Sequence, residues 1–244
     1  MDTIIYGRNP VLEAVNAGFE IDRVLIMEGA SGPQINQIIA VLKEKNILFR
    51  FTGKKKLDQL SENHNHQGVL AFVAAHKYCT VDEILAKASE MAENPLIVIA
   101  DGLSDPHNLG SIIRTANAAG AHGIIIPKNR SVSLNATVLK VSAGAALYTP
   151  VARVTNISST IDYLKENGVW ITGTGLSDNQ NCYEADFKGP TAIVIGSEDK
   201  GISRLVSEKC DFMVKIPMIG EIQSLNASVA AGVLLYEAVR QRLS

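Results

Sequence analysis

Three separated stretches set polar side chains and glycines at the ends of apolar runs, where they could form a site for chemistry. They run from Asn108 to Ala116, from Ile195 to Gly201 and from Ile216 to Ser228. In α/β proteins, strand ends and helix starts of this kind present backbone amides and short polar side chains to an open crevice. Three such ends in one domain indicate a single composite pocket.

The first stretch carries a cation that could bind a phosphate or a carboxylate. Arg114 follows Asn108 by six residues in a mostly small or apolar helical pattern. A guanidinium presents a planar fork of donors that fits either anion. Asn108 itself stands where a helix N-cap is expected. A simple cap and an ordinary surface salt bridge are the alternatives for these two side chains.

The second stretch predicts a tight turn close to a ligand. Gly196 and Gly201 bracket the sequence Ser-Glu-Asp-Lys directly after an apolar run. Glycine lets the backbone approach a ligand closely, and Glu198 faces the crevice by its position at the strand end. A plain turn with solvated charges is the alternative.

The third stretch predicts the start of a long helix beside the same pocket. Ser224 and Asn226 are expected in its first turn, where free amides and the positive end of the helix dipole are available. Small residues continue along the helix and would let another helix approach closely: Ala227, Ala230, Ala231 and Gly232.

Apolar and amphipathic segments alternate along the chain, which predicts an α/β fold in two parts. Strands and helices of the first part are expected at Ile4–Tyr6, Pro10–Asn16, Arg23–Met27, Gln34–Lys45, Leu48–Thr52, Leu57–Ser61 and Gly68–Ala74. Strands of the second part are apolar on both faces and predict a buried parallel sheet; they are expected at Leu96–Ala100, Gly123–Ile126, Val169–Thr172, Thr191–Ile195 and Phe212–Ile216. Its helices are expected at Asn108–Ala119, Asn135–Ala146, Ile157–Lys165 and Leu225–Arg242.

A polar amphipathic stretch separates the two parts. It runs from Thr80 to Glu93, and it predicts a connecting helix because Thr80 can cap it and Pro95 cannot continue it. We therefore expect a first domain over residues 1–76, a helical linker over 77–94 and a second domain over 95–244.

Composition excludes several classes of protein. With 244 residues, 46% hydrophobic and 20% charged, the chain is typical of globular proteins and not of disordered or fibrous ones. Neither a membrane-spanning run nor a leader sequence is evident, so we expect a cytoplasmic protein. Cys79, Cys182 and Cys210 are scattered and are expected to stay reduced. His64 and His66 stand in a polar turn and are given little weight as ligands, so no metal is expected.

A local basic segment contrasts with the net charge of −2, which argues against binding nucleic acid by bulk charge. Residues 43–56 hold six basic residues against the single acid Glu44, with Phe49 and Phe51 between them. A surface that contacts phosphates and a solvated helix end are equally good interpretations.

Together the three stretches resemble the motifs of a known enzyme family. Residues 108–120, 195–201 and 216–228 are similar, in order and spacing, to those of the SpoU (TrmH-like) RNA ribose 2'-O-methyltransferases of the SPOUT superfamily. The resemblance covers Pro95 to Ser244. The opening Tyr6-Gly-Arg-Asn-Pro-Val-Leu-Glu-Ala resembles the subgroup whose N-terminal domain is similar to ribosomal protein L30e, which includes the 23S rRNA guanosine 2'-O-methyltransferase.

The resemblance implies a fold, a cofactor and an assembly. The second domain would contain a deep trefoil knot, formed where the segment near Ile216 to Leu225 passes through the loop after Ile195, a rare exception to unthreaded topology. The knot would bind S-adenosyl-L-methionine, and the family is dimeric. The cofactor site would be lined by Gly175, Ile195, Gly196, Ile216, Met218 and Leu225.

The resemblance also implies the reacting residues. Arg114 would be catalytic, with the site completed by Asn108, Glu198, Ser224 and Asn226. Because guanidinium stays protonated in proteins, we expect Arg114 to hold the phosphate and stabilise the alkoxide rather than act as a base.

The expected substrate is a guanosine in 23S rRNA, bound through the first domain. Transfer RNA and an rRNA adenosine are alternative substrates. Two alternatives belong to other classes of protein. One is a non-catalytic RNA-binding module. The other is a nucleotide-dependent dehydrogenase, for which Gly173 to Gly175 give only an incomplete glycine fingerprint.

Overall fold

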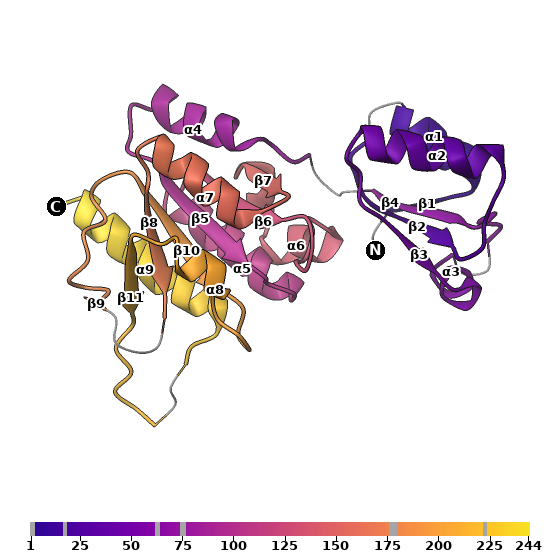
Figure 1. The fold of residues 1–244 in the computed structure, drawn as a ribbon. Helices are drawn as coiled ribbons and strands as arrows, with labels where there is room; N and C mark the ends of the chain where they lie inside the picture. The colour runs from indigo at the N-terminus through magenta and orange to yellow at the C-terminus, as the bar shows by residue number, and fades with distance from the viewer. Residues whose placement is uncertain (1–2, 17–18, 62–63, 74–76, 176–179, 222–223) are drawn as a thin grey trace. The chain divides into compact units, whose positions relative to one another are not determined.

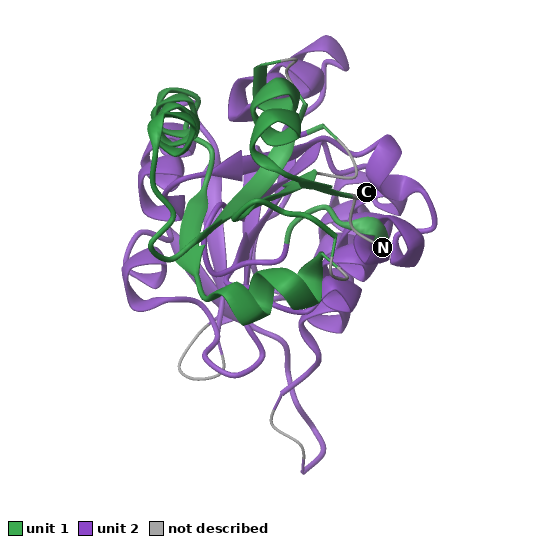
Figure 2. Cartoon of the chain, turned by 90° about the vertical axis from the view of Figure 1, so that its right-hand side faces the viewer, with its two compact units in different colours: residues 1–77, 133–136 green, residues 78–132, 137–244 purple. Residues whose placement is uncertain are grey.

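The structure, a computed structural model, describes residues 3–16, 19–61, 64–73, 77–175, 180–221 and 224–244. The chain divides into two compact units, one of residues 1–77 with 133–136 and one of residues 78–132 with 137–244 (Figure 2). Among the helices of these described segments, none combines the length and the apolar character that crossing a membrane requires.

The first unit is a four-stranded sheet with helices on both faces (Figure 1). Its order is β1-β4-β2-β3, with β4 antiparallel to both β1 and β2, and β3 parallel to β2. The elements are β1 (Thr3–Tyr6), α1 (Arg8–Asn16), β2 (Ile21–Met27), α2 (Pro33–Glu44), β3 (Phe49–Thr52), α3 (Lys54–Leu60) and β4 (Val69–Val73).

Alternation along the strands of this sheet gives the first unit two cores. Val24 and Ile26 of β2 belong to a cluster with the buried residues of α1 and α2. Leu25, between them, belongs to a second cluster with Leu57 of α3. Successive strand residues point to opposite faces, so one strand contributes to both clusters.

The second unit is built on a seven-stranded sheet in the order β7-β6-β5-β10-β8-β11-β9. Every pairing in it is parallel, which confirms the predicted parallel sheet. Its elements are α4 (Val81–Glu90), β5 (Leu96–Asp101), α5 (Pro106–Ala118), β6 (Gly123–Pro127), α6 (Ala136–Val141), the 3-10 helix η1 (Ala145–Leu147), β7 (Val151–Val154), α7 (Ile157–Glu166), β8 (Trp170–Thr174), β9 (Gln180–Asn181), β10 (Thr191–Gly196), α8 (Arg204–Ser207), β11 (Phe212–Lys215) and α9 (Ala227–Arg242).

Helices cover both faces of this sheet. Buried side chains of α4, α7 and α8 share one core with β5, β6, β7, β8 and β10. Helix α9 lies against β10 and packs on α5 (Figure 1). Gly232 of α9 faces Thr115 of α5, because a Cβ added at Gly232 would lie 3.7 Å from the Thr115 methyl carbon. At least part of the small-residue face of α9 therefore packs against α5 of the same chain.

The expected connecting helix is α4, and it is part of the second unit. Thr80 Oγ1 accepts a hydrogen bond from the Glu83 amide at 3.2 Å, and the Glu83 carboxylate accepts one from the Thr80 amide at 2.6 Å. This capping box fixes the start of the helix, as the sequence indicated. Ile84 then packs against the sheet at Gly123, where an added Cβ would come within 2.6 Å of it.

Several predicted helix boundaries were wrong. Helix α5 begins at Pro106 with Asp105 as its cap, since Asp105 Oδ1 accepts the His107 amide at 2.9 Å. Asn108 is therefore not the cap. Helix α9 begins at Ala227 and Asn226 is its cap, so Ser224 precedes the helix.

Other predicted elements were interrupted or missed. The helix expected at Asn135–Ala146 is split into α6 and η1, because Ala143 and Gly144 both adopt positive φ, at 50° and 85°. Strands β7 and β9 and helix α8 were not predicted. All three are short, with four residues or fewer, so they carry little periodic signal.

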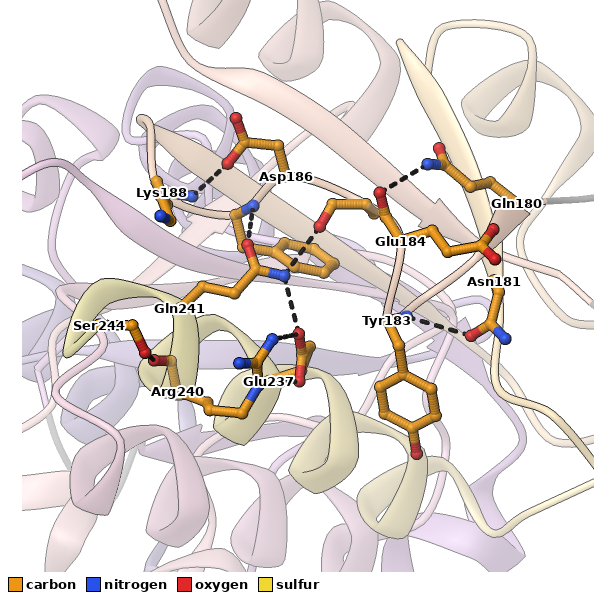
Figure 3. Close-up of polar contacts among 12 residues, drawn as sticks. Gln180, Asn181, Tyr183, Glu184, Asp186, Lys188, Glu237, Arg240, Gln241 and Ser244 are labelled. Carbon is orange, nitrogen blue, oxygen red and sulfur yellow. Dashed lines mark hydrogen bonds and ion pairs between the residues drawn. The ribbon is translucent and has the colours of Figure 1, made fainter.

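The end of α9 is fixed to the segment that precedes β10 by a buried glutamine (Figure 3). Gln241 accepts the Phe187 amide at 2.8 Å and donates to the Ala185 carbonyl and to Glu237, both at 2.8 Å. Arg240 also donates to Glu237, so this nearly buried carboxylate is paired. Gln241 itself is 8% exposed, and its side chain satisfies main-chain groups that water would otherwise have to reach.

We predict that Gln241→Leu lowers the free energy of unfolding of the second unit by about 2 to 4 kcal/mol, because it leaves the Phe187 amide and the Ala185 carbonyl without partners. Urea denaturation measures this. Gln180→Leu is the matched control, since Gln180 is exposed and donates only to the Glu184 carbonyl, and it should cost less than about 1 kcal/mol. Equal losses in the two variants would contradict this role of Gln241.

A buried histidine makes the second unit sensitive to pH. His122 is 1% exposed, and its Nδ1 accepts the Leu96 amide at 3.0 Å. Its Nε2 lies 3.3 Å from Glu93 without hydrogen-bond geometry. Burial is the main cause that lowers the pKa of His122; Lys87 and Arg242 lower it further, and Glu93 opposes them.

We predict that this histidine destabilises the fold in acid. Because its pKa is lower in the folded state, the stability it contributes is present above its unfolded pKa of about 6.5 and is lost as the pH falls from that value through the lower folded-state pKa. The loss cannot exceed about 1.4 kcal/mol for each pH unit. His122→Asn keeps an acceptor for the Leu96 amide and should flatten the dependence of the urea midpoint on pH. Unchanged pH dependence in His122→Asn would contradict the prediction.

Candidate functional site

A cavity of about 580 Å³ opens at the carboxyl edge of the second sheet. The ends of β8, β10 and β11, the loops that follow them and the start of α9 form it. Its lining residues are Thr174, Gly175, Ile195, Gly196, Ser197, Glu198, Asp199, Lys200, Gly201, Ile202, Ser207, Met213, Val214, Ile216, Met218, Ser224, Leu225, Ala227 and Ala230.

The turn after β10 forms one wall of this cavity. Ser197 and Gly201 exchange two backbone hydrogen bonds of 3.1 and 2.8 Å, which close the turn. A Cβ added at Gly196 would lie 2.1 Å from the Gly201 carbonyl carbon and 2.2 Å from the Ile202 amide nitrogen. Only glycine permits the backbone to fold back this closely, so the loop depends on Gly196.

All six residues that the resemblance assigned to a cofactor line this cavity: Gly175, Ile195, Gly196, Ile216, Met218 and Leu225. Four of them have apolar side chains, and two are glycines. A volume of this size, lined by both apolar and polar groups, suits a small organic ligand that has both kinds of surface.

Asn226 joins the helix start to two other predicted residues. Its Oδ1 accepts the amides of Ser228 and Val229 at 2.9 and 3.4 Å, which caps α9. Its Nδ2 donates to Asn108 Oδ1 at 2.8 Å and to Glu198 Oε1 at 2.5 Å. One amide group therefore joins three separate stretches of the chain, its own and those of Asn108 and Glu198.

Asn108 serves this cluster. It lies in the first turn of α5 and is 5% exposed, so its side chain must find a partner inside the protein. Asn226 supplies that partner, at a separation of 118 residues. The N-cap interpretation failed because Asp105 and Pro106 form the better helix start, with an acidic cap and proline in the first turn.

The remaining two predicted residues differ in their placement. Ser224 lines the cavity beside Leu225. Arg114 is exposed and is not among the lining residues. It follows Asn108 by six residues in α5, which is about 9 Å along the helix axis and about one and two thirds turns around it. Within one chain, Arg114 therefore does not lie in the cluster formed by Asn108, Glu198 and Asn226.

Sequence reasoning missed part of the lining. Ile202 and Met213 belong to the turn beyond Gly201 and to β11, and Ala230 stands one helical turn after Asn226. Ala230 could have been identified from the sequence, because residues four positions apart, such as Asn226 and Ala230, lie on the same side of a helix. Nothing in the sequence indicates Ile202, since it reaches the cavity only because the turn folds back.

The thiols near this sheet are not reactive groups. Burial is the main cause that raises the pKa of Cys210 to about 12 and that of Cys79 to about 11. Both therefore stay neutral at physiological pH and are poor nucleophiles. Within the described segments, no group of three or more His, Cys, Asp or Glu residues is placed to hold a metal ion.

Comparison with known families assigns both units. Residues 95–236 match the SpoU rRNA Methylase family, and residues 4–79 match the family described as RNA 2'-O ribose methyltransferase substrate binding. A Staphylococcus aureus (strain MSSA476) relative, whose name places it in the TrmH family of tRNA/rRNA methyltransferases, is 49% identical over 241 residues, covering 99% of this chain and 97% of that protein.

Two crystal structures resemble the whole chain. The SpoU methyltransferase AviRb from Streptomyces viridochromogenes, in complex with the cofactor AdoMet, has a TM-score of 0.64 and 28% identity, covering 100% of this chain and 91% of that one. An AdoMet-bound rRNA methyltransferase from Sinorhizobium meliloti has a TM-score of 0.63 and 27% identity, covering 99% of this chain and 88% of that one.

We predict that Asn226→Asp lowers the free energy of unfolding by about 1 to 3 kcal/mol, because it keeps the cap acceptor but loses the donor to Asn108 and Glu198 and places a second carboxylate beside Glu198. In that background Glu198→Gln should recover part of the loss, since its new amide can donate to the new carboxylate. Urea denaturation of the two single variants and the double variant measures the coupling, expected at roughly 1 kcal/mol. Simple addition of the two single effects would contradict the contact.

Proposed function

The chain belongs to the SpoU rRNA methylase family, and we propose that it methylates the ribose 2'-hydroxyl of a guanosine in 23S rRNA. As a member of this family it is an RNA methyltransferase that uses S-adenosyl-L-methionine. The observation that carries the proposal is the cavity at the sheet edge, with Asn226 joining Asn108 and Glu198 at its margin. Transfer RNA and an rRNA adenosine are the alternative substrates.

The cavity residues fit this cofactor. Ile195, Ile216 and Leu225 provide apolar surface for an adenine ring, and Gly196 lets the turn after β10 fold back to form the wall beside it. These residues would hold S-adenosyl-L-methionine, which supplies a methyl group on a sulfonium with a good leaving group. The protein must then align the ribose hydroxyl and stabilise the charge that develops on it.

We assign the residues of the site as follows. Arg114 binds the phosphate next to the reacting ribose and stabilises the developing alkoxide, because its guanidinium keeps its charge. Asn226 positions Glu198, and Glu198 in turn fixes the turn that holds the cofactor. Ser224 stands beside Leu225 at the cavity, where its hydroxyl can contact the substrate.

We further propose that the enzyme is a homodimer through the face that carries Arg114. Arg114 is exposed and does not line the cavity of its own chain, so a second copy is the simplest source of it. Val229 and Tyr236 of the neighbouring α9 are 50% and 52% exposed, which gives this face apolar surface to bury. Arg114 of the partner subunit would then complete the site.

The fold of each unit extends the proposal. We propose that the segment between β11 and α9 passes through the loop after β10 and forms a deep trefoil knot; in support, Ile216, Met218 and Leu225 of that segment line the same cavity as Gly196. A crystal structure that traces the segment outside this loop would contradict the knot. The first unit would be L30e-like and select the RNA in the cytoplasm, consistent with its match to a substrate-binding family.

We predict that Arg114→Ala lowers the methylation rate at least about 100-fold and changes the dissociation constant of S-adenosyl-L-methionine by less than about twofold, because Arg114 contacts only the RNA. Tritiated methyl transfer to 23S rRNA and calorimetry measure the two quantities. Arg204→Ala is the control, since Arg204 is 92% exposed and pairs only with Glu208. Parallel loss of cofactor binding would overturn the role of Arg114, and absent cofactor binding in the unmodified protein would favour a non-catalytic RNA-binding module.

The same variant tests the dimer. Mixing Arg114→Ala with Glu198→Ala, each inactive alone, should restore about one quarter of the activity if each site uses residues of both subunits, because half of the dimers then hold one intact site. No recovery after subunit exchange would show that Arg114 acts within its own chain.

A further inference from the structure

The first unit contains a cavity of its own, with a volume of about 690 Å³. Arg8 and Lys54, which line it, are the first residues of α1 and α3, and Met27 is the last residue of β2. The segment from His64 to Gly68, which leads into β4, forms the opposite part of the lining. The cavity therefore lies where several strands end and helices begin, and where α/β units bind ligands.

Arg8 is held in a fixed position at this cavity. Its backbone amide donates to Gln67 Oε1 at 3.2 Å, and its side-chain Nε donates to the Gln67 carbonyl at 3.0 Å. Among the described residues, its terminal Nη groups make no ion pair. The guanidinium is therefore oriented by one edge while the other stays available for an anion.

The segment that holds Arg8 is itself braced. His66 is 7% exposed; its Nδ1 accepts the Gly68 amide at 2.9 Å, so its Nε2 donates to Asp58 Oδ1, also at 2.9 Å. Between them Gln67 adopts φ 50°, which is uncommon for a residue with a side chain. Backbone strain of this kind persists where the surroundings enforce it, and it gathers at binding sites.

An aromatic pair borders the cavity. His64 lines it, and its ring stacks on Tyr6 with the centroids 5.0 Å apart and the planes 27° from parallel. His64 Nδ1 donates to the Ser61 carbonyl at 2.6 Å, which fixes the ring and leaves Nε2 as an acceptor. Both side chains are exposed. Exposed aromatic rings fixed in this way are platforms on which unpaired bases stack.

One basic residue of the segment at residues 43–56 contributes to this cavity. Lys54 lines it, and the other basic residues of the segment do not. Lys45 instead donates to the Val15 carbonyl at 2.6 Å, which is a structural contact. Among the described residues that line this cavity, the arginine and lysine side chains are therefore Arg8 and Lys54, and Asp58 supplies a carboxylate that can accept from a base edge.

We propose that this cavity binds one nucleotide of an unpaired RNA segment. Arg8 and Lys54 hold its phosphate, and its base stacks at the Tyr6 and His64 rings. The inference rests on the proposed function, because that function supplies the RNA. A paired duplex does not fit this arrangement, since its bases are stacked on one another and their faces are not free. A free nucleotide shares the chemistry, so the test includes one.

The test measures binding of a fluorescein-labelled single-stranded RNA of ten nucleotides to the full chain by fluorescence anisotropy. His64→Ala should weaken binding about fivefold or more, because base stacking is lost, and His64→Phe should keep it within about twofold. Lys54→Ala should weaken it about 3- to 10-fold and make the salt dependence shallower by about 0.7 in log–log slope. Lys55→Ala, one residue along the same helix and outside the cavity, should change it by less than about twofold.

Three further measurements make the outcomes decisive. A duplex RNA of the same sequence should bind equally to the wild type and to His64→Ala. Guanosine monophosphate should compete at least 100-fold more weakly than the oligonucleotide, because a strand also contacts the surface around the cavity; equal competition would identify a mononucleotide site and overturn the proposal. Thermal unfolding must be unchanged in each variant, and His64→Phe keeps the test valid if His64→Ala unfolds.

Equal effects of Lys54→Ala and Lys55→Ala would indicate a diffuse basic surface and refute the site. Unchanged binding in His64→Ala, with the fold intact, would refute the stacking. The proposed methyltransferase function can fail independently of the nucleotide site. If the chain binds single-stranded RNA through His64 and Lys54 but does not methylate rRNA, the nucleotide site stands and the proposed function is wrong.

Discussion

A single amide side chain, that of Asn226, holds the candidate active site together. Its oxygen caps α9, and its nitrogen donates to Asn108 from α5 and to Glu198 from the turn after β10. These three elements are far apart in sequence, and the hydrogen bonds of Asn226 fix them to one another. The cavity beside them depends on the same contacts, because the turn and the helix start form two of its walls. Asn108, the buried member of this cluster, depends on Asn226 for its partner, so the hydrogen bond between them favours one arrangement of α5 and α9 over others.

Backbone geometry adds a second constraint. Gly196 lets the chain turn back on itself within van der Waals contact of Gly201 and Ile202, and the turn so formed carries Glu198 towards Asn226. A side chain at Gly196 would force the turn away from the sheet. The hydrogen bond between Asn226 and Glu198 therefore depends on Gly196, although Gly196 has no side chain that could take part in it.

Much of the second unit could be predicted from local patterns. Leu96 to Ala100 and Thr191 to Ile195 are almost entirely apolar, and such runs, separated by helical segments, are typical of a buried parallel sheet. The strand Val151–Val154 escaped prediction because it is short and contains Arg153. Asn108 was misassigned because local rules cannot reveal a partner 118 residues away, which also explains why nothing in the sequence indicated the contact between Arg8 and Gln67. The cofactor residues came from family resemblance, and spacing alone would have given only a generic pocket.

Our central proposal is that this protein places a methyl group on a ribose of ribosomal RNA. The most direct test is to map 2'-O-methylated nucleotides in total RNA from cells with and without the gene. We predict that one guanosine of 23S rRNA loses its 2'-O-methyl group when the gene is absent and regains it when the gene is restored. Unchanged rRNA, with a 2'-O-methyl group lost from a tRNA or from no RNA at all, would contradict the claim.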